Sequence, residues 1–394
     1  MMSQAVSAVS QQQISTSLKR ELYWLACLGA GALVIGGILL SLVWRWQGAL
    51  QWLPQAGLIW SFVCYQTSRR LDLNRPDLEA ALYRGLGWGN RLTMLRAWMI
   101  AATGGFLFQP WPDGPVTAWL PGIIYFAAAV LDRVDGYVAR RSGRSSLLGG
   151  ELDTLSDALG LAVASLLAYG YGQVHWSYLS VGLAYYAFHG GILWRKAQDL
   201  PVYPLPPSMQ RRAWAGFQMG FLVVALWPLF YPPLTSTAGF AFMLPVLIGF
   251  VIDWLIASGH IDREAESVGR RFRRLTDFSQ TVLQPALRIV IVVLLSVLIV
   301  QSGLPVTADN NITWFSVMAT GGFVLTAVSI LLGIAGRCFG LLLIALSGWY
   351  YSGNPMQAVD DVLFCCVVWS MLLGSGRFSL WQEDEHWINR YDGA

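Results

Sequence analysis

The chain has 394 residues, of which 55% are hydrophobic and only 12% are charged. About a quarter of the residues of a soluble domain are charged, so this composition excludes a soluble globular protein. The formal net charge of +3 says little by itself, because the basic residues are concentrated in particular connections. The chain is expected to work in a lipid bilayer, without a nucleic-acid partner.

Long stretches without Asp, Glu, Lys or Arg predict membrane helices, since a helix needs about 20 apolar residues to cross the hydrocarbon. In chain order, about twelve spans are expected near residues 22–44, 50–67, 93–110, 116–134, 150–170, 178–195, 213–231, 238–257, 286–303, 312–334, 338–352 and 358–375. The predicted fold class is therefore all-α, a polytopic transmembrane helical bundle.

The positions of Lys and Arg predict the orientation, because positively charged connections stay on the cytoplasmic side. With the N-terminus on that side, Arg45 is the only one of the 26 basic residues that falls on the opposite side. We expect an integral protein of the cytoplasmic (inner) membrane. This topology puts residues 131–157, LDRVDGYVARRSGRSSLLGGELDTLSD, at the cytoplasmic face.

Four aspartates surround the predicted turn in this stretch. Asp132 and Asp135 are three residues apart on one helix, and Asp153 and Asp157 are four apart on the next, so both pairs can face one point. A single carboxylate at a helix end is ordinary, but four at these offsets would repel one another and lose hydration. One or two hard divalent cations with oxygen ligands would compensate them. Paired cations about 4 Å apart serve displacement at phosphorus.

Small and basic residues lie between the aspartates. The small ones, which leave room for a bulky ligand near the backbone, are Gly136, Ala139 and Gly149. The basic ones, which can bind phosphate oxygens, are Arg140, Arg141 and Arg144. The local chemistry predicts a site for metal and phosphate at the membrane surface.

The same residues match the pattern D-x2-D-G-x2-A-R-x8-G-x3-D-x3-D in full, which resembles the signature of the CDP-alcohol phosphatidyltransferase family. A second similarity is the N-x-x-T-x-x-R segment at residues 90–96, which often begins the first core helix of family members. The resemblance implies a six-helix core. It also implies an enzyme that moves a substituted phosphate from a CDP-linked donor to an alcohol and releases CMP.

The resemblance also implies roles for single residues. Asp132, Asp135 and Asp153 would be the main ligands of two Mg²⁺ or Mn²⁺ ions. Asp157 would be the general base on the acceptor hydroxyl and a further candidate metal ligand. The cytidine nucleotide would lie against Gly136, Ala139, Arg140 and Gly149. Candidates for a phosphate on the acceptor are Arg141, Arg144, Arg211 and Arg212, of which the last two fit plain cytoplasmic anchors equally well.

The preferred function is a metal-dependent phosphatidyltransferase of phospholipid biosynthesis. It would transfer phosphatidyl from CDP-diacylglycerol to a small polar alcohol, phosphorylated or not, such as glycerol 3-phosphate or an inositol phosphate. An alternative enzyme would transfer from CDP-choline or CDP-ethanolamine to diacylglycerol. Two alternatives from other classes are a divalent-cation transporter and an inactive scaffold. Relatives are often homodimers.

Four regions are expected along the chain. They are an N-terminal region with two membrane helices at 1–83, the six-helix core at 84–258, a basic amphipathic cytoplasmic linker at 259–285 and a four-helix membrane region at 286–394. The N-terminal region carries no obvious chemistry and is interpreted as packing or anchoring. The end of the last region, Gly374–Gln382, faintly resembles DoxX-like membrane proteins.

Overall fold

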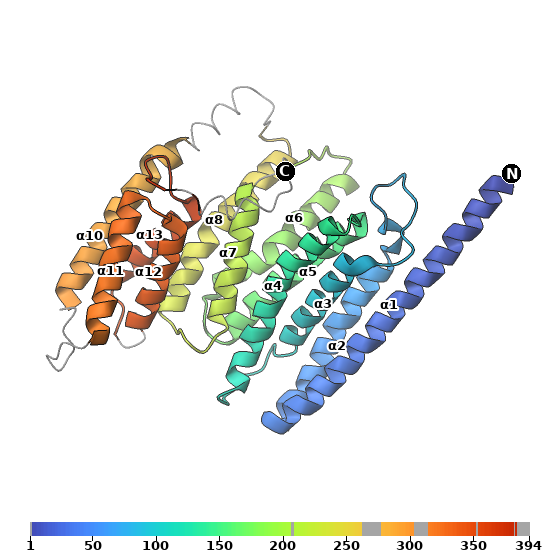
Figure 1. Cartoon of the computed structure of the whole chain (residues 1–394), viewed down its shortest axis with the longest axis horizontal. Coiled ribbons are helices and arrows are strands. Elements are labelled where there is room, and N and C mark those ends of the chain that lie inside the picture. The colour runs from blue at the N-terminus through green and yellow to red at the C-terminus, as the bar shows by residue number, and fades with distance from the viewer. Residues whose placement is uncertain are drawn as a thin grey trace. The chain divides into compact units, whose positions relative to one another are not determined.

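The computed structural model describes residues 2–205, 209–261, 277–302, 314–351, 354–381 and 383. Twelve α-helices in these ranges confirm the all-α prediction (Figure 1). They are α1 (Met2–Val43), α2 (Trp46–Ser68), α3 (Gly87–Gly104), α4 (Leu120–Arg141), α5 (Leu147–Gly170), α6 (Leu179–Ala197), α7 (Met209–Ala225), α8 (Leu234–Ala257), α10 (Gln284–Ser302), α11 (Trp314–Leu332), α12 (Gly336–Tyr351) and α13 (Ala358–Leu373).

The prediction of twelve membrane spans is wrong. In the described ranges five segments are long and apolar enough to cross a bilayer, namely Gln12–Val43, Thr117–Arg141, Leu147–Gly170, Leu234–Ala257 and Ser279–Gln301. Helices α12 and α13 are apolar but have only 16 residues each. An apolar stretch of sequence can extend past the end of the helix that it contains. Hydropathy alone therefore overestimated the length of such helices. The chain is an integral membrane protein with several apolar helices.

The helices form two compact units, and each is described by itself. The first contains Met1–Tyr185 and Leu222–Leu229, and the second contains Tyr186–Phe221 and Phe230–Ala394. The four regions predicted from the sequence stay a prediction. Of the predicted amphipathic linker, residues 262–276 lie outside the described residues.

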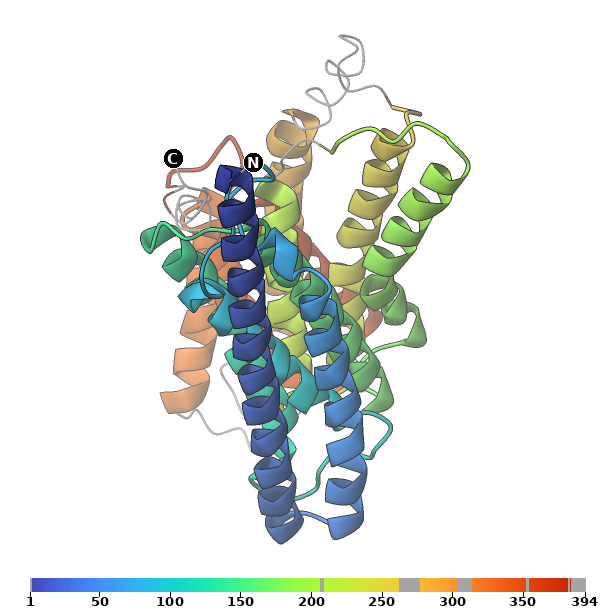
Figure 2. The ribbon, with the colours of Figure 1, turned by 90° about the vertical axis from the view of Figure 1, so that its right-hand side faces the viewer.

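In the first unit, α3 is the helix around which the others assemble. It packs against α2, α4 and α5, while α1 and α2 lie side by side (Figure 2). The indole of Trp98 on α3 donates to the Gly29 carbonyl of α1 at 2.9 Å. Where α3 crosses α4, a Cβ added at Gly89 would lie 2.8 Å from the Cβ of Ala139. The two helices can approach this closely because both residues are small.

The turn between α4 and α5 has well-defined ends. Gly143 adopts a left-handed backbone with φ of 62°, and the Arg144 amide donates to the Ala139 carbonyl at 3.2 Å, which closes the last turn of α4. Ser146 begins α5, and its hydroxyl accepts the Gly149 amide at 3.0 Å. The two caps hold both motif helices in place on either side of a short connection.

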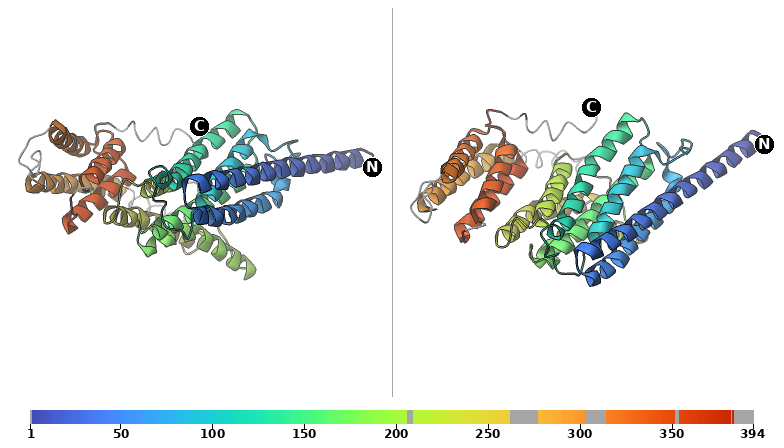
Figure 3. Two further views of the ribbon diagram at one scale, coloured as in Figure 1. Left: turned by 90° about the horizontal axis from the view of Figure 1, so that it is seen from below. Right: turned by 60° about the horizontal axis from the view of Figure 1, so that its bottom comes forward.

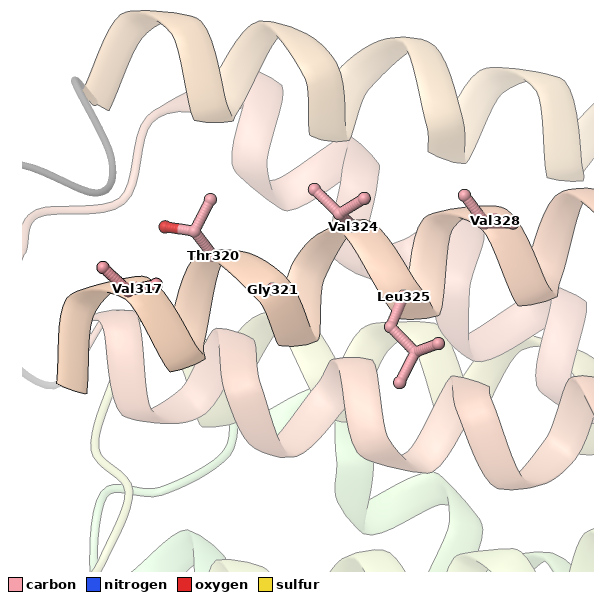
Figure 4. A pocket seen from close by; sticks show the side chains of 6 residues that line it. All are labelled: Val317, Thr320, Gly321, Val324, Leu325 and Val328. Carbon is pink, nitrogen blue, oxygen red and sulfur yellow. The ribbon is translucent and has the colours of Figure 1, made fainter. Parts of the chain in front are cut away.

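The second unit contains a bundle of α10 to α13 (Figure 3). Its core is apolar, with Ile291, Leu295, Phe323 and Leu343 all fully buried. On the outside of α11, Val317, Thr320, Gly321, Val324, Leu325 and Val328 line a shallow hollow of about 550 Å³ (Figure 4). The exposed side chains of this face are aliphatic, as expected for a helix that faces lipid.

Candidate active site

Helices α4 and α5 bring three of the four predicted carboxylates together. Asp132 and Asp135 lie on α4 and Asp153 on α5, and one oxygen from each lies within 4.8 Å of the others. Asp135 is buried, whereas Asp132 and Asp153 are partly exposed. The cluster can therefore be reached from one side and is enclosed on the other.

Arg96 of α3 lies against this cluster, although the sequence analysis gave it no role. Its side chain is almost completely buried. Its Nη1 lies 2.7 Å from Oδ1 of Asp132 and 2.8 Å from Oδ1 of Asp153. Its Nη2 contacts Oδ1 of Asp157, which joins the fourth carboxylate to the same guanidinium. One buried cation therefore links both motif helices to α3.

The other two residues of the N-x-x-T-x-x-R segment also make contacts within the site. The Thr93 hydroxyl donates to Oδ2 of Asp135 at 2.9 Å. Nδ2 of Asn90 donates to the Ser146 hydroxyl at 3.1 Å, at the start of α5. Asn90, Thr93 and Arg96 are three residues apart and so lie along one side of α3. This spacing is the sequence signal that could have identified this wall of the site.

A pocket of about 250 Å³ opens beside the carboxylates. Its lining includes Asp135 and Asp153 together with the four residues predicted to receive a nucleotide, Gly136, Ala139, Arg140 and Gly149. A Cβ added at Gly149 would lie 2.7 Å from Oδ1 of Asn90, so any side chain there would displace the pocket wall. The structure brings these predicted residues together, and their binding roles stay predictions.

The candidate acceptor-phosphate residues are more dispersed. Arg141 is exposed and donates to the Tyr137 hydroxyl at 2.9 Å. Arg144 is exposed and lies over the Tyr83 ring, 5.5 Å from its centroid. Neither is among the residues that line the pocket. Arg211 and Arg212 lie in the first turn of α7, and their side chains are outside the described residues.

The donor atoms of the cluster fit a hard divalent cation. Asp132, Asp135 and Asp153 supply carboxylate oxygens close enough to share one ion, and oxygen is the ligand that Mg²⁺ and Mn²⁺ prefer. The Asp157 side chain is 39% exposed, and it contacts the same Arg96 guanidinium as Asp132 and Asp153. A carboxylate that remains accessible next to a metal site can accept a proton from a substrate.

Comparison with known proteins shows which family a part of the chain resembles. Residues 88–252 match the model of the CDP-alcohol phosphatidyltransferase family. A CDP-diacylglycerol–glycerol-3-phosphate 3-phosphatidyltransferase of Blochmanniella floridana is 31% identical over 90 residues, which are 23% of this chain and 46% of the relative. The enzyme of the same name from Cereibacter sphaeroides is 36% identical over 100 residues, 24% of this chain and 42% of the relative. No solved structure matches the chain.

Residues 88–252 therefore resemble the CDP-alcohol phosphatidyltransferases. These are metal-dependent membrane enzymes of phospholipid synthesis that use a CDP-alcohol donor and an alcohol acceptor. The matched part spans less than half the length of the two curated relatives. Because the match ends at residue 252, the faint resemblance of the C-terminal region to DoxX-like proteins stays a prediction, as does a homodimer.

Proposed function

We propose that the protein transfers a phosphatidyl group from CDP-diacylglycerol to a small polar alcohol and releases CMP. The observation that carries the proposal is the continuity of the carboxylate cluster with the pocket, since Asp135 and Asp153 belong to both. A nucleotide in the pocket would present its phosphates to the carboxylate end. Glycerol 3-phosphate is the preferred acceptor, because both similar relatives are named for it.

The chemistry proposed for the site is a displacement at phosphorus. The acceptor oxygen forms a bond to the phosphatidyl phosphorus, and the bond from that phosphorus to the CMP oxygen breaks. Asp157 accepts the hydroxyl proton, for which its partial exposure leaves access. Arg96 holds the Asp157 carboxylate through Oδ1, and so restricts its orientation toward the acceptor.

Asp132, Asp135 and Asp153 would hold the divalent ions, and two ions are the proposed number. When bound, these ions would neutralise the pyrophosphate of the donor and stabilise the charge that develops on CMP. Arg140, an exposed residue that lines the pocket, is suited to bind a phosphate oxygen of the donor.

The proposed membrane placement is a site at the cytoplasmic face of the inner membrane. Both motif helices are apolar enough to cross a bilayer, and the carboxylates of α4 lie near its C-terminal end. At such a depth the acyl chains of the donor can remain among lipids while the head group reaches the pocket. A water-soluble acceptor can enter from the other side.

The test is CMP release by the purified chain in detergent micelles with CDP-diacylglycerol and Mg²⁺ or Mn²⁺. Glycerol 3-phosphate and inositol phosphate are added one at a time. We expect release that requires one acceptor and the metal, and that is lost in Asp157→Asn. The matched control is Asp113→Asn, because Asp113 is an exposed carboxylate in the connection before α4.

Other results would redirect the proposal. CMP release only from CDP-choline or CDP-ethanolamine with diacylglycerol would show that the lipid is the acceptor and not the donor. An Asp157→Asn variant as active as the wild type would remove Asp157 as the general base. No CMP release with any of these donors, from a protein that is folded and binds Mn²⁺, would contradict the proposed transferase.

A further inference from the structure

Asn74 is a fully buried amide that lies outside the matched family segment. It follows the short helix Leu71–Leu73 in the connection between α2 and α3. Its Nδ2 donates to the Gly85 carbonyl at 3.0 Å, and its Oδ1 accepts from Nδ2 of Asn90 at 3.1 Å. A buried amide is costly without partners, and here both ends are hydrogen-bonded.

These bonds determine how the Asn90 amide is turned. Because Nδ2 of Asn74 donates to the Gly85 carbonyl, the atom of Asn74 that faces Asn90 is its acceptor, Oδ1. Asn90 must therefore turn its own donor, Nδ2, toward Asn74. Nδ2 of Asn90 also donates to the Ser146 hydroxyl. The carbonyl oxygen of Asn90 is therefore turned toward Gly149, and both residues line the pocket.

The connection that carries Asn74 is also tied to the turn between the motif helices. The Leu147 amide donates to the Arg75 carbonyl at 2.9 Å, and the Tyr83 hydroxyl donates to the Ser145 carbonyl at 3.3 Å. The Tyr83 amide donates back to the Asn74 carbonyl at 2.9 Å. Asn74 thus sits in a hydrogen-bonded loop that holds the pocket rim from outside the family segment.

Asn90 lines the pocket on the same helix as Thr93. It precedes Thr93 by about one helical turn, and Thr93 binds Asp135. If the donor phosphates meet the carboxylates, the nucleoside lies toward Asn90. A hydrogen-bond acceptor held rigidly at Asn90 would favour binding of the nucleoside without contributing to metal binding.

We propose that Asn74 is a positioning residue for the nucleotide pocket, which acts through Asn90 and touches neither nucleotide nor metal. The inference rests on the proposed function only in that the pocket must receive a cytidine nucleotide. It extends that function by assigning part of the donor affinity to the connection between α2 and α3, which was interpreted from the sequence as packing or anchoring.

The test is calorimetric binding of CDP, in the presence of Mn²⁺, to the full chain and to Asn74→Ala. We expect about tenfold weaker CDP binding in the variant, since the Asn90 amide in the pocket wall loses one of its two partners. Binding of Mn²⁺ alone should stay within about twofold, because the carboxylates keep their own contacts. The KM for CDP-diacylglycerol should rise more than kcat falls.

A matched control is Asn354→Ala, which removes an exposed asparagine that donates only locally, to the Tyr350 carbonyl at 2.9 Å. It should bind CDP like the wild type. Asn74→Ser also loses the bond to Asn90, because its hydroxyl is one bond shorter than the amide, but it leaves a smaller cavity than alanine, so it serves as the second variant if Asn74→Ala does not fold.

A double-mutant cycle tests whether Asn74 acts through Asn90. In an Asn90→Ala background, Asn74→Ala should weaken CDP binding no further. Additive losses would overturn the proposed route, and equal CDP affinity of wild type and Asn74→Ala would overturn the role itself. Failure of the wild type to bind CDP at all would instead contradict the proposed function, so the two failures are distinguishable.

Discussion

Two almost completely buried arginines, Arg96 in the first compact unit and Arg288 in the second, have different partners. Arg96 is 1% exposed and directs its guanidinium at three carboxylates of α4 and α5. Arg288 of α10 is 3% exposed and donates to the Phe378 carbonyl at 2.7 Å, in the segment that follows α13. Both charges lie in helices of a membrane protein, where burial of a charge is expensive.

The difference indicates that Arg96 belongs to the candidate active site, whereas Arg288 stabilises the fold. Around Arg96 the negative charge exceeds the positive charge, so the cluster still favours binding of further cations. Arg288 instead binds the backbone of the segment that follows α13, as does Gln284, whose Nε2 donates to the Gly374 carbonyl at 2.8 Å. A buried arginine among carboxylates therefore indicates chemistry more strongly than a buried arginine on carbonyls.

The largest expected effect comes from Asp153→Asn. Loss of one carboxylate from the cluster should lower kcat for CMP release about 1,000-fold or more, because several kcal/mol of charge stabilisation depends on the metal. Steady-state CMP release measures it. The matched aspartate of the second unit is Asp361, which accepts from the Thr237 hydroxyl at 2.6 Å. Asp361→Asn should keep wild-type kcat, and a similar loss there would show a general requirement for folding.

The next largest effect is expected on stability, and it should differ between the arginine variants of the two units. Arg96→Met leaves three partly exposed carboxylates without their cation, so it should destabilise the metal-free protein by about 2–3 kcal/mol, less than for a fully buried pair because solvent screens them. Mn²⁺ should restore much of that loss in thermal unfolding, since the ion binds the folded cluster. Arg288→Met should also unfold earlier, but Mn²⁺ should raise its midpoint no more than that of the wild type. Equal rescue of both variants would contradict the comparison.

A smaller effect is expected from Gly149→Ala, which tests the pocket wall. The added Cβ would lie 2.7 Å from Oδ1 of Asn90, so the wall must shift at a cost of about 1–3 kcal/mol. CDP affinity, measured by calorimetry, should fall about tenfold. Gly170→Ala on the same helix is the control, because a Cβ at Gly170 meets nothing within 4 Å. Unchanged affinity in Gly149→Ala would argue against CDP binding next to Asn90.

The smallest effect is expected for an ion pair outside the site. Nη2 of Arg91 lies 2.7 Å from Oε1 of Glu21, and both side chains are partly exposed. Glu21→Gln keeps an oxygen for the Leu86 amide but removes the charge, so stability should fall by about 0.5 kcal/mol. Chemical denaturation measures the change, and CMP release should stay the same. A loss near that of Arg96→Met would mean that arginine pairs in this unit are equivalent.

The sequence predicted the carboxylate cluster because its geometry is local. Asp132 and Asp135 on one helix, and Asp153 and Asp157 on the next, are related by helix periodicity and a short turn. The count of membrane spans failed for the opposite reason. Whether an apolar run continues as one helix depends on caps and packing, as the 16-residue lengths of α12 and α13 illustrate.

An all-α membrane protein and a two-helix motif with its carboxylates on facing turns could be inferred from the amino-acid sequence, since these follow from composition and from spacings of three and four residues. The tertiary structure alone decided that Arg96 lies against those carboxylates and that Asn74 holds Asn90. Both contacts join separate elements of the chain. No short-range pattern specifies such partners, because they are selected by the packing of α3 against α4 and α5 and by the cost of leaving a buried polar group unpaired.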